Sequence, residues 1–181
     1  SHPDFDRELA ILRLRAPGPP VHPICLPRPA AVNLGPRDMS VLARLRPEFI
    51  RIAPPWHTFA ETIDGLVEAL VAGRAMPAPC GPTAVQAVVA REGEGSTAML
   101  DIAAGVPHAR LPDLPGAVMA LAASSQGLYE AVPTVSIRIV ALVLSPPAAT
   151  TDHLQLLAEV ATLLRPAELP PRLLAPHDGS D

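Results

Sequence analysis

Apolar residues recur at the helical period in three segments of the chain. In the first segment they lie three and four positions apart, at Ile63, Leu66, Val67, Leu70 and Val71. This spacing places them on one face of an α-helix. Thr58 supplies an N-cap hydroxyl before the run, and Gly73 follows it as a stop signal. The pattern therefore predicts an amphipathic helix that is capped by Thr58 and closed by Gly73.

The second and third segments also carry recognisable helix ends. Pro82 suits the first turn of a helix that ends near Arg91 and Gly93. Its apolar members are Val85, Val88 and Val89. The third helix is predicted to start at Thr150, Thr151 and Asp152, all natural N-cap types, and to present Leu154, Leu157, Ala158, Ala161 and Leu164 on its apolar face. A further helical turn or two is expected at residues 168–174.

Shorter apolar runs predict β-strands. Residues 49–53 alternate apolar and polar side chains, and the runs 117–122 and 137–144 are short and bounded by Gly or Pro. The last of them is also rich in β-branched residues, which favour strands. Because strands and helices alternate along the chain, the sequence predicts an α/β domain, with a mixed β-sheet sandwiched between α-helices.

Prolines crowd the N-terminal part of the chain, at positions 17, 19, 20, 23, 27, 29 and 36. Proline can neither donate to a ladder nor continue a helix, so this part is expected to be extended and irregular. We therefore divide the chain into a proline-rich N-terminal segment or linker, residues 1–44, a folded domain with one core, residues 45–176, and a C-terminal tail, residues 177–181. The first residue is serine, which suggests that the chain was cut from a longer one.

Charge and cysteine content narrow the class of partner and the compartment. The 181 residues carry a formal net charge of −4, include no lysine, and have scattered arginines, whereas nucleic-acid-binding proteins gather basic residues on one face. We expect no nucleic-acid partner. Cys25 and Cys80 lie far apart without a C-x-x-C pattern, so unpaired thiols in a reducing cytoplasm are expected. No apolar run approaches the roughly 18 residues of a membrane span, so we expect contact with a membrane only through a partner.

The strongest chemical candidate is His108, within the sequence Gly105-Val106-Pro107-His108-Ala109-Arg110. Pro107 stiffens the backbone before the histidine, and Gly105 permits a turn, so the ring is expected to project from a strand end in a fixed direction. A neutral imidazole is a nucleophile near pH 7 and can hold a labile phosphoryl group. We interpret His108 as a phosphoryl acceptor, with an ordinary surface histidine as the alternative.

Other residues offer hydrogen-bond donors to a phosphoryl group. Arg91 has a planar fork of donors, and Ser96 and Thr97 have hydroxyls and amides that could line a small anion nest. His153 lies in the first turn of the predicted last helix, where the helix dipole disfavours imidazolium, so a neutral, donating ring is expected. The alternatives are a helix-end cation facing water for Arg91 and a capping or solvated histidine for His153.

Stretches in three parts of the chain resemble one family. They are "LRPEFIRI", "REGEGSTAMLDIAAGVPHAR" and "LVLSPPAATTDHLQLLAEVATLLRPAELPPRLLAP". From Leu45 to Pro176 the chain is similar to the enzyme IIA domain of the phosphoenolpyruvate-dependent sugar phosphotransferase system, in its fructose, mannitol and nitrogen-regulatory class. The resemblance implies a phosphotransferase whose His108 accepts a phosphoryl group from an HPr-like phosphocarrier protein. It also implies transfer onward to a cysteine or histidine of a IIB domain during sugar uptake.

The same resemblance assigns the supporting residues. It makes His153 a stabiliser of the phosphorylated histidine and not an acceptor, and it matches Arg91, Ser96 and Thr97 to the arginine and the Ser-Thr loop of the family. It implies no cofactor. A metal site at the two histidines would lack a clear third ligand, so no metal is predicted.

The resemblance leaves alternatives to sugar uptake. One is a regulatory module, of the nitrogen type or tethered to a transporter, whose His108 phosphorylation state controls binding to a transporter, kinase or other protein. Another is a scaffold that has lost phosphorylation, because residues 98–103 replace a turn that is often glycine-rich in the family. Fewer glycines make a stiffer loop. Asp101 within it would also repel a phosphoryl group if its side chain pointed inward.

Overall fold

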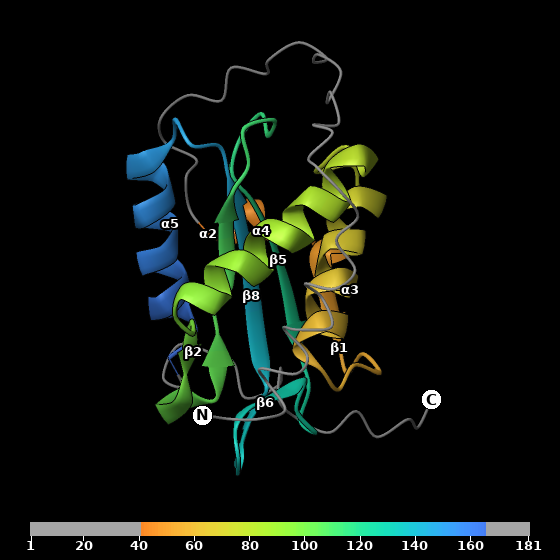
Figure 1. Cartoon of the computed structure of the whole chain (residues 1–181), viewed down its shortest axis with the longest axis vertical. Coiled ribbons are helices and arrows are strands. Elements are labelled where there is room, and N and C mark those ends of the chain that lie inside the picture. The colour runs from red at the N-terminus through yellow and green to blue at the C-terminus, as the bar shows by residue number, and fades with distance from the viewer. Residues whose placement is uncertain (1–40, 166–181) are drawn as a thin grey trace.

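The computed structural model of the chain describes residues 41–165, and these form a three-layered α/β sandwich (Figure 1). A mixed sheet lies between α3 (Phe59–Ala72) with α4 (Gly81–Glu94) on one face and α5 (Thr150–Leu163) with the short α2 (Val41–Arg44) on the other. The predicted fold class is confirmed. The proline-rich segment up to residue 40, the expected turns at 168–174 and the tail 177–181 lie outside the described residues.

The main sheet has six strands in the order β1-β5-β8-β3-β2, with β4 also paired to β8. The strands are β1 (Ile50–Ile52), β2 (Ala98–Met99), β3 (Ala104–Gly105), β4 (His108–Arg110), β5 (Val118–Ala123) and β8 (Ile139–Ser145). β5 is antiparallel to β8, whereas β3 and β4 both run parallel to β8 along its other side. A separate hairpin consists of β6 (Tyr129–Val132) and β7 (Val135–Ile137). The 3₁₀ turns are η1 (Pro47–Phe49), η2 (Ala78–Cys80) and η3 (Leu100–Ile102).

The central strand β8 is buried on both faces. Leu142 and Leu144 pack into the cluster under α3 and α4, and Ala141 and Val143 pack into the cluster under α5. This alternation follows from the two-residue period of a strand. The single core expected from the sequence is therefore divided by the sheet into two apolar clusters, and β8 reads as a continuous apolar run because neither face meets water.

The helix predicted between Thr58 and Gly73 is confirmed as α3. Thr58 is its N-cap, with Oγ1 accepting a hydrogen bond from the Glu61 amide at 3.1 Å. The Glu61 carboxylate in turn accepts a hydrogen bond from the Thr58 amide at 3.2 Å and another from the His57 amide at 2.8 Å. These amide donors lower the pKa of Glu61. The arrangement is a capping box, in which two amide groups at the start of the helix are satisfied reciprocally.

Thr58→Ala is expected to destabilise the domain by about 1 kcal/mol, because it removes the acceptor for the Glu61 amide. Urea unfolding followed by circular dichroism measures this loss. The matched control is Thr83→Ala, since Thr83 is exposed within α4. Equal unfolding midpoints for the two variants would mean that the cap contributes nothing measurable.

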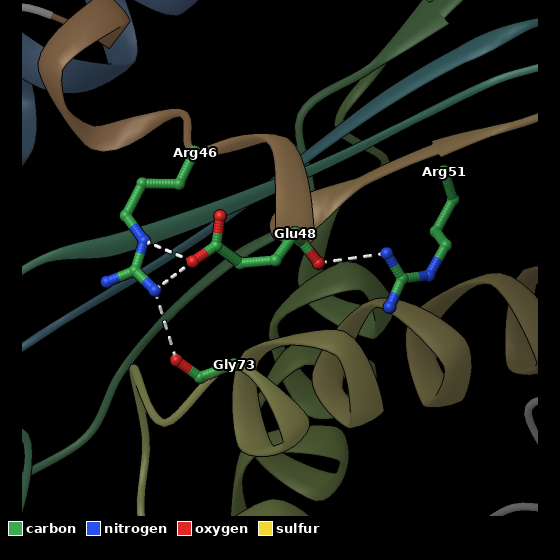
Figure 2. Close-up of polar contacts among 4 residues, drawn as sticks. All are labelled: Arg46, Glu48, Arg51 and Gly73. Carbon is green, nitrogen blue, oxygen red and sulfur yellow. Dashed lines mark hydrogen bonds and ion pairs between the residues drawn. The ribbon is translucent and has the colours of Figure 1, made fainter.

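A polar network joins η1 to the end of α3 (Figure 2). The Arg46 guanidinium bonds the Glu48 carboxylate and also donates to the Gly73 carbonyl at 3.3 Å. From the other side, Arg51 donates to the backbone carbonyl of Glu48 at 2.9 Å. The bond from Arg46 lowers the pKa of Glu48. Arg46 also lies over the ring of Phe49, with 4.7 Å between the guanidinium carbon and the ring centroid. The network fixes where the chain enters the sheet.

The helix α5 exists as predicted but differs in its cap and its buried face. Its N-cap is Ala149, and no side chain caps it. The buried positions are His153, Leu156, Val160 and Leu164, whereas Leu154, which was predicted to be on the apolar face, is 60% exposed. Two overlapping faces of this helix are apolar. Only contact with the sheet selects between them.

Cys80 is disulfide-bonded in the structure. The expectation of an unpaired thiol is therefore wrong for this residue, which ends η2 and is buried. Cys25, the only other cysteine in the sequence, lies outside the described residues. Pairing depends on how closely two Cα atoms approach in the fold. The separation of cysteines along the sequence does not reveal that distance.

Candidate functional site

A pocket of about 450 Å³ lies where α4 and α5 meet β4. Its lining residues are Ala87, Arg91, His108, Ala109, Arg110, His153, Leu154 and Leu157. The structure thus brings together His108, His153 and Arg91, three of the predicted site residues. The topology explains the convergence, since β4 pairs with the C-terminal half of β8, α5 follows β8, and α4 packs against β4.

His108 is half-buried and is the first residue of β4. Its Nδ1 lies 2.9 Å from the Val106 carbonyl oxygen. A carbonyl can only accept a hydrogen bond, so Nδ1 carries the proton that is shared with it. In the neutral ring, Nε2 is then unprotonated and keeps its lone pair. Pro107 lies between Val106 and His108 and has no amide hydrogen to donate. Its carbonyl accepts a hydrogen bond from the Val143 amide at 3.0 Å, which holds this segment on the sheet.

His153 is 4% exposed and lies in the first turn of α5. Its Nδ1 is 2.7 Å from Oγ of Ser145, and its ring centroid is 5.5 Å from that of His108, with the rings tilted by 59°. Burial lowers the pKa of His153, and the positive charge of Arg110 and the neighbouring His108 lower it further. The lowered pKa favours the neutral form of the ring, which is the form expected from the sequence.

Arg91 lies in the last turn of α4 and lines the pocket. Its guanidinium donates to the Gly95 carbonyl at 3.3 Å. The bond agrees with a cation at a helix C-terminus, where the dipole favours positive charge, and a role of Arg91 as a donor to a phosphoryl group stays a prediction.

Arg110 is a pocket residue to which the sequence analysis assigned no role. It is exposed, and its guanidinium donates to Oγ1 of Thr150 at 3.0 Å and to the Pro147 carbonyl at 3.3 Å. These bonds tie β4 to the start of α5. The signal was present in the sequence: in a strand, residues two apart lie on the same face, so Arg110 shares the face of His108.

Ser96 and Thr97 are not among the residues that line the pocket. The Thr97 amide and hydroxyl donate to the two carboxylate oxygens of Glu92, at 2.8 and 2.6 Å, and the Ser96 hydroxyl accepts from the Ala98 amide at 3.2 Å. The structure therefore does not place the predicted Ser-Thr donors beside His108. The buried Glu92, which holds this loop, was not singled out from the sequence.

Comparison with known proteins decides the family. The family described as "Phosphoenolpyruvate-dependent sugar phosphotransferase system, EIIA 2" matches residues 44–177. The chain belongs to this family. A search of curated protein sequences found no match to this chain. The family takes part in phosphoryl transfer, so the IIA domain has a general phosphotransferase role.

Solved structures share the fold at low sequence identity. The nitrogen regulatory protein IIA-Ntr from Neisseria meningitidis has a TM-score of 0.60 and 19% identity, covering 73% of this chain and 88% of that one. IIA mannitol from Escherichia coli, in complex with phosphorylated IIB, has a TM-score of 0.58 and 20% identity, covering 75% and 92%. A crystal structure of IIA mannitol from Escherichia coli has a TM-score of 0.53 and 21% identity, covering 71% and 96%. Likeness at this level supports the IIA fold.

The glycine-poor loop of this IIA domain, residues 98–103, is ordered by β2 and η3. It ends at Ala103, whose φ of 52° lies in the left-handed region that favours glycine. Asp101 is exposed and is not among the lining residues of the pocket. The unfavourable charge considered for Asp101 therefore does not arise in the pocket.

Two features are absent from residues 41–165. Within this range, no group of three or more His, Cys, Asp or Glu side chains could hold a metal ion. None of the helices that the structure describes has both the length and the hydropathy of a membrane span.

The pKa of His153 predicts a pH dependence of stability. Its folded pKa is lowered from 6.5, so below the unfolded pKa the unfolded chain binds a proton more readily than the folded domain does. The free energy of unfolding should therefore fall as the pH drops from 6.5 toward the lower folded pKa. Urea unfolding between about pH 5 and 7.5 measures the slope. In His153→Asn the slope should be smaller, and an identical slope in both proteins would contradict this origin.

Proposed function

We propose that this IIA domain is a phosphocarrier in which Nε2 of His108 accepts a phosphoryl group from an HPr-like phosphohistidine protein. The observation that carries the proposal is the bond of His108 Nδ1 to the Val106 carbonyl. It leaves Nε2 unprotonated on a ring that lines a pocket with two arginines and a second histidine. A nucleophile, a fixed ring orientation and positive charge are the requirements of phosphoryl transfer.

In the proposed step, the lone pair of His108 Nε2 forms a bond to phosphorus while the nitrogen–phosphorus bond of the donor histidine breaks. The electron pair of that bond stays on the departing donor ring. His108 gains positive charge as it becomes phosphorylated, and its Nδ1–H strengthens the bond to the Val106 carbonyl, 2.9 Å away. Transfer to the next acceptor reverses these events, with the acceptor as nucleophile.

The phosphoryl oxygens need donors that are in place before the transfer. Arg91 and Arg110 approach from α4 and β4, and His153 offers a ring N–H from α5. The first turn of α5 has no side-chain cap, and uncapped amides at a helix N-terminus attract anions. We assign all three side chains to charge stabilisation.

Ser96 and Thr97 have a less direct role in this proposal. Glu92 accepts both Thr97 donors and so holds the loop that follows α4. Because Arg91 precedes Glu92 in the same helix turn and bonds Gly95 of that loop, the loop supports the arginine. Direct contact of Ser96 or Thr97 with phosphate remains a prediction, and for Thr97 it requires the amide or hydroxyl to leave Glu92.

The proposed acceptor is a IIB-type domain in sugar uptake. Leu154 is 60% exposed beside the pocket, and Leu157 also lines it, so α5 offers apolar side chains at the edge of the site where a partner protein must dock. The second candidate is a regulatory IIA module, of the nitrogen type or tethered to a transporter. It is supported by the shared fold of IIA-Ntr. Both candidates use the same phosphorylated His108 and differ only in the partner.

Reconstitution tests the proposal. The domain is incubated with ³²P-labelled phosphoenolpyruvate, enzyme I and HPr, and we expect an acid-labile phosphate on the domain that depends on both proteins. Purified IIB domains are then added to the isolated phosphorylated domain. Transfer of label to a IIB domain supports sugar uptake, whereas a stable label that no IIB domain removes supports the regulatory role. Absence of label with active enzyme I and HPr contradicts the phosphocarrier function.

A further inference from the structure

Ser145 is a buried polar residue that the sequence analysis did not consider. It ends β8, is 0% exposed, and its Oγ lies 2.7 Å from Nδ1 of His153. Its backbone carbonyl accepts from the Leu111 amide at 2.8 Å, and it pairs in register with Arg110. The backbone of Ser145 is therefore fixed by the sheet, and its hydroxyl is presented to His153 from a rigid position.

The two pocket histidines have different kinds of hydrogen-bond partner. His108 meets the Val106 carbonyl through Nδ1, and since a carbonyl only accepts, this Nδ1 must be protonated. His153 meets a hydroxyl through the same ring atom, and a hydroxyl can donate as well as accept. A neutral His153 can donate to an anion from Nε2 only when Nδ1 is the accepting nitrogen. The hydroxyl permits that tautomer, and a carbonyl in its place would forbid it.

We propose that Ser145 is a positioning residue that donates its hydroxyl proton to Nδ1 of His153 and so holds the ring with Nε2–H facing the pocket. The two rings then have opposite tautomers: His108 presents a lone pair that attacks phosphorus, and His153 presents a proton that meets a phosphoryl oxygen. The kinetic consequence rests on the proposed function. The tautomer itself does not, because it is a property of the unphosphorylated domain.

The first test is therefore made without any phosphoryl donor. Long-range ¹H–¹⁵N NMR spectra of the unphosphorylated domain, labelled with ¹⁵N-histidine, distinguish protonated from unprotonated ring nitrogens. At neutral pH we expect His153 to be unprotonated at Nδ1 and protonated at Nε2, with the opposite pattern for His108. His108→Gln and His153→Gln variants assign the signals. A protonated Nδ1 on a neutral His153 overturns the inference.

The second test measures the rate of phosphorylation of His108. Partners that orient metal-bound histidines typically contribute 10- to 100-fold, and by the same physical reasoning Ser145→Ala should slow phosphorylation by about tenfold and allow both His153 tautomers in the spectrum. Ser145→Thr, which keeps the hydroxyl, should restore the tautomer and most of the rate. The matched control is Ser124→Ala. Ser124 is also buried but lies beyond the opposite end of β5, and its loss should leave rate and tautomer unchanged.

A double-mutant comparison shows whether Ser145 acts through His153. In a His153→Ala background, Ser145→Ala should slow phosphorylation by less than about twofold further, because the ring that it orients is gone. A tenfold further loss would overturn the assignment, since it would show an effect independent of His153. If Ser145→Ala does not fold, the spectrum of the unsubstituted domain still shows which tautomer His153 adopts. If His108 accepts no phosphate at all, the proposed function fails, while the tautomer result for Ser145 stands on its own.

Discussion

His108→Ala should abolish acid-labile phosphorylation of the IIA domain and leave the domain folded. Among the described histidines, His108 alone has Nδ1 bonded to a carbonyl, which leaves an unprotonated Nε2 in a pocket with arginines. His153 bonds a hydroxyl through Nδ1 and is buried, and His57 is exposed near the start of α3. The measurement is ³²P incorporation from phosphoenolpyruvate through enzyme I and HPr, with circular dichroism as the test of folding.

Two variants sharpen this prediction. His57→Ala is the matched control and should be labelled like the unsubstituted domain. His108→Gln keeps much of the side-chain volume and the possibility of a bond to Val106 but has no nucleophilic nitrogen, so it should also remain unlabelled. Undiminished label on either His108 variant would mean that another residue is the acceptor, and the pocket would then need a different interpretation.

The second large effect is expected at the donors around the phosphoryl group. Arg91→Ala and His153→Ala should each slow phosphorylation of His108 about a hundredfold, which corresponds to about 3 kcal/mol of transition-state stabilisation for one positioned donor. His108 should remain the labelled residue in both variants. Arg91→Lys should fall between the two extremes, because an ammonium keeps the charge and loses the planar fork of donors.

Single-turnover rates with a fixed concentration of phosphorylated HPr measure these effects. Arg138→Ala is the control for a general loss of positive charge, since Arg138 is exposed between β7 and β8, and it should react at the unsubstituted rate. If Arg91→Ala and His153→Ala also reacted at that rate, Arg91 would be only the cation that bonds Gly95 at the end of α4. Arg110 and the first turn of α5 would then be the main phosphate ligands.

Gly105 was singled out from the sequence, but the structure shows a second reason for a glycine at this position. From the sequence, Gly105 was interpreted as permitting a turn before His108, but in the structure Gly105 lies in β3. A Cβ at this position would lie 2.7 Å from the hydroxyl of Tyr129. A side chain at this position would therefore force a shift of the buried tyrosine, whose pKa is raised by burial and by the charge of Glu92. That tyrosine belongs to β6, and the sequence around Gly105 does not indicate that it lies nearby.

Local signals in the sequence were sufficient to predict α3, and the contact that orients the ring of His108 is also local. The capping box of α3 involves residues three positions apart, and its apolar face follows the helical period. Likewise, the bond that sets the tautomer of His108 joins it to Val106, two residues away. Features of this kind depend on contacts within one turn or one strand end. The order of residues along the chain therefore determines them.

Tertiary structure decided the rest, because the deciding contacts join residues that lie more than one helical turn apart in the chain or share faces that periodicity leaves ambiguous. The apolar pattern of α5 fits two faces, and packing on the sheet buried Leu156 and exposed Leu154. Thr97 was predicted to donate to phosphate, but in the fold its amide and hydroxyl donate to the carboxylate of Glu92. Arg110 bonds Thr150 across 40 positions. In each case several partners were possible for the side chain, and only the three-dimensional arrangement determines which of them lies within contact distance.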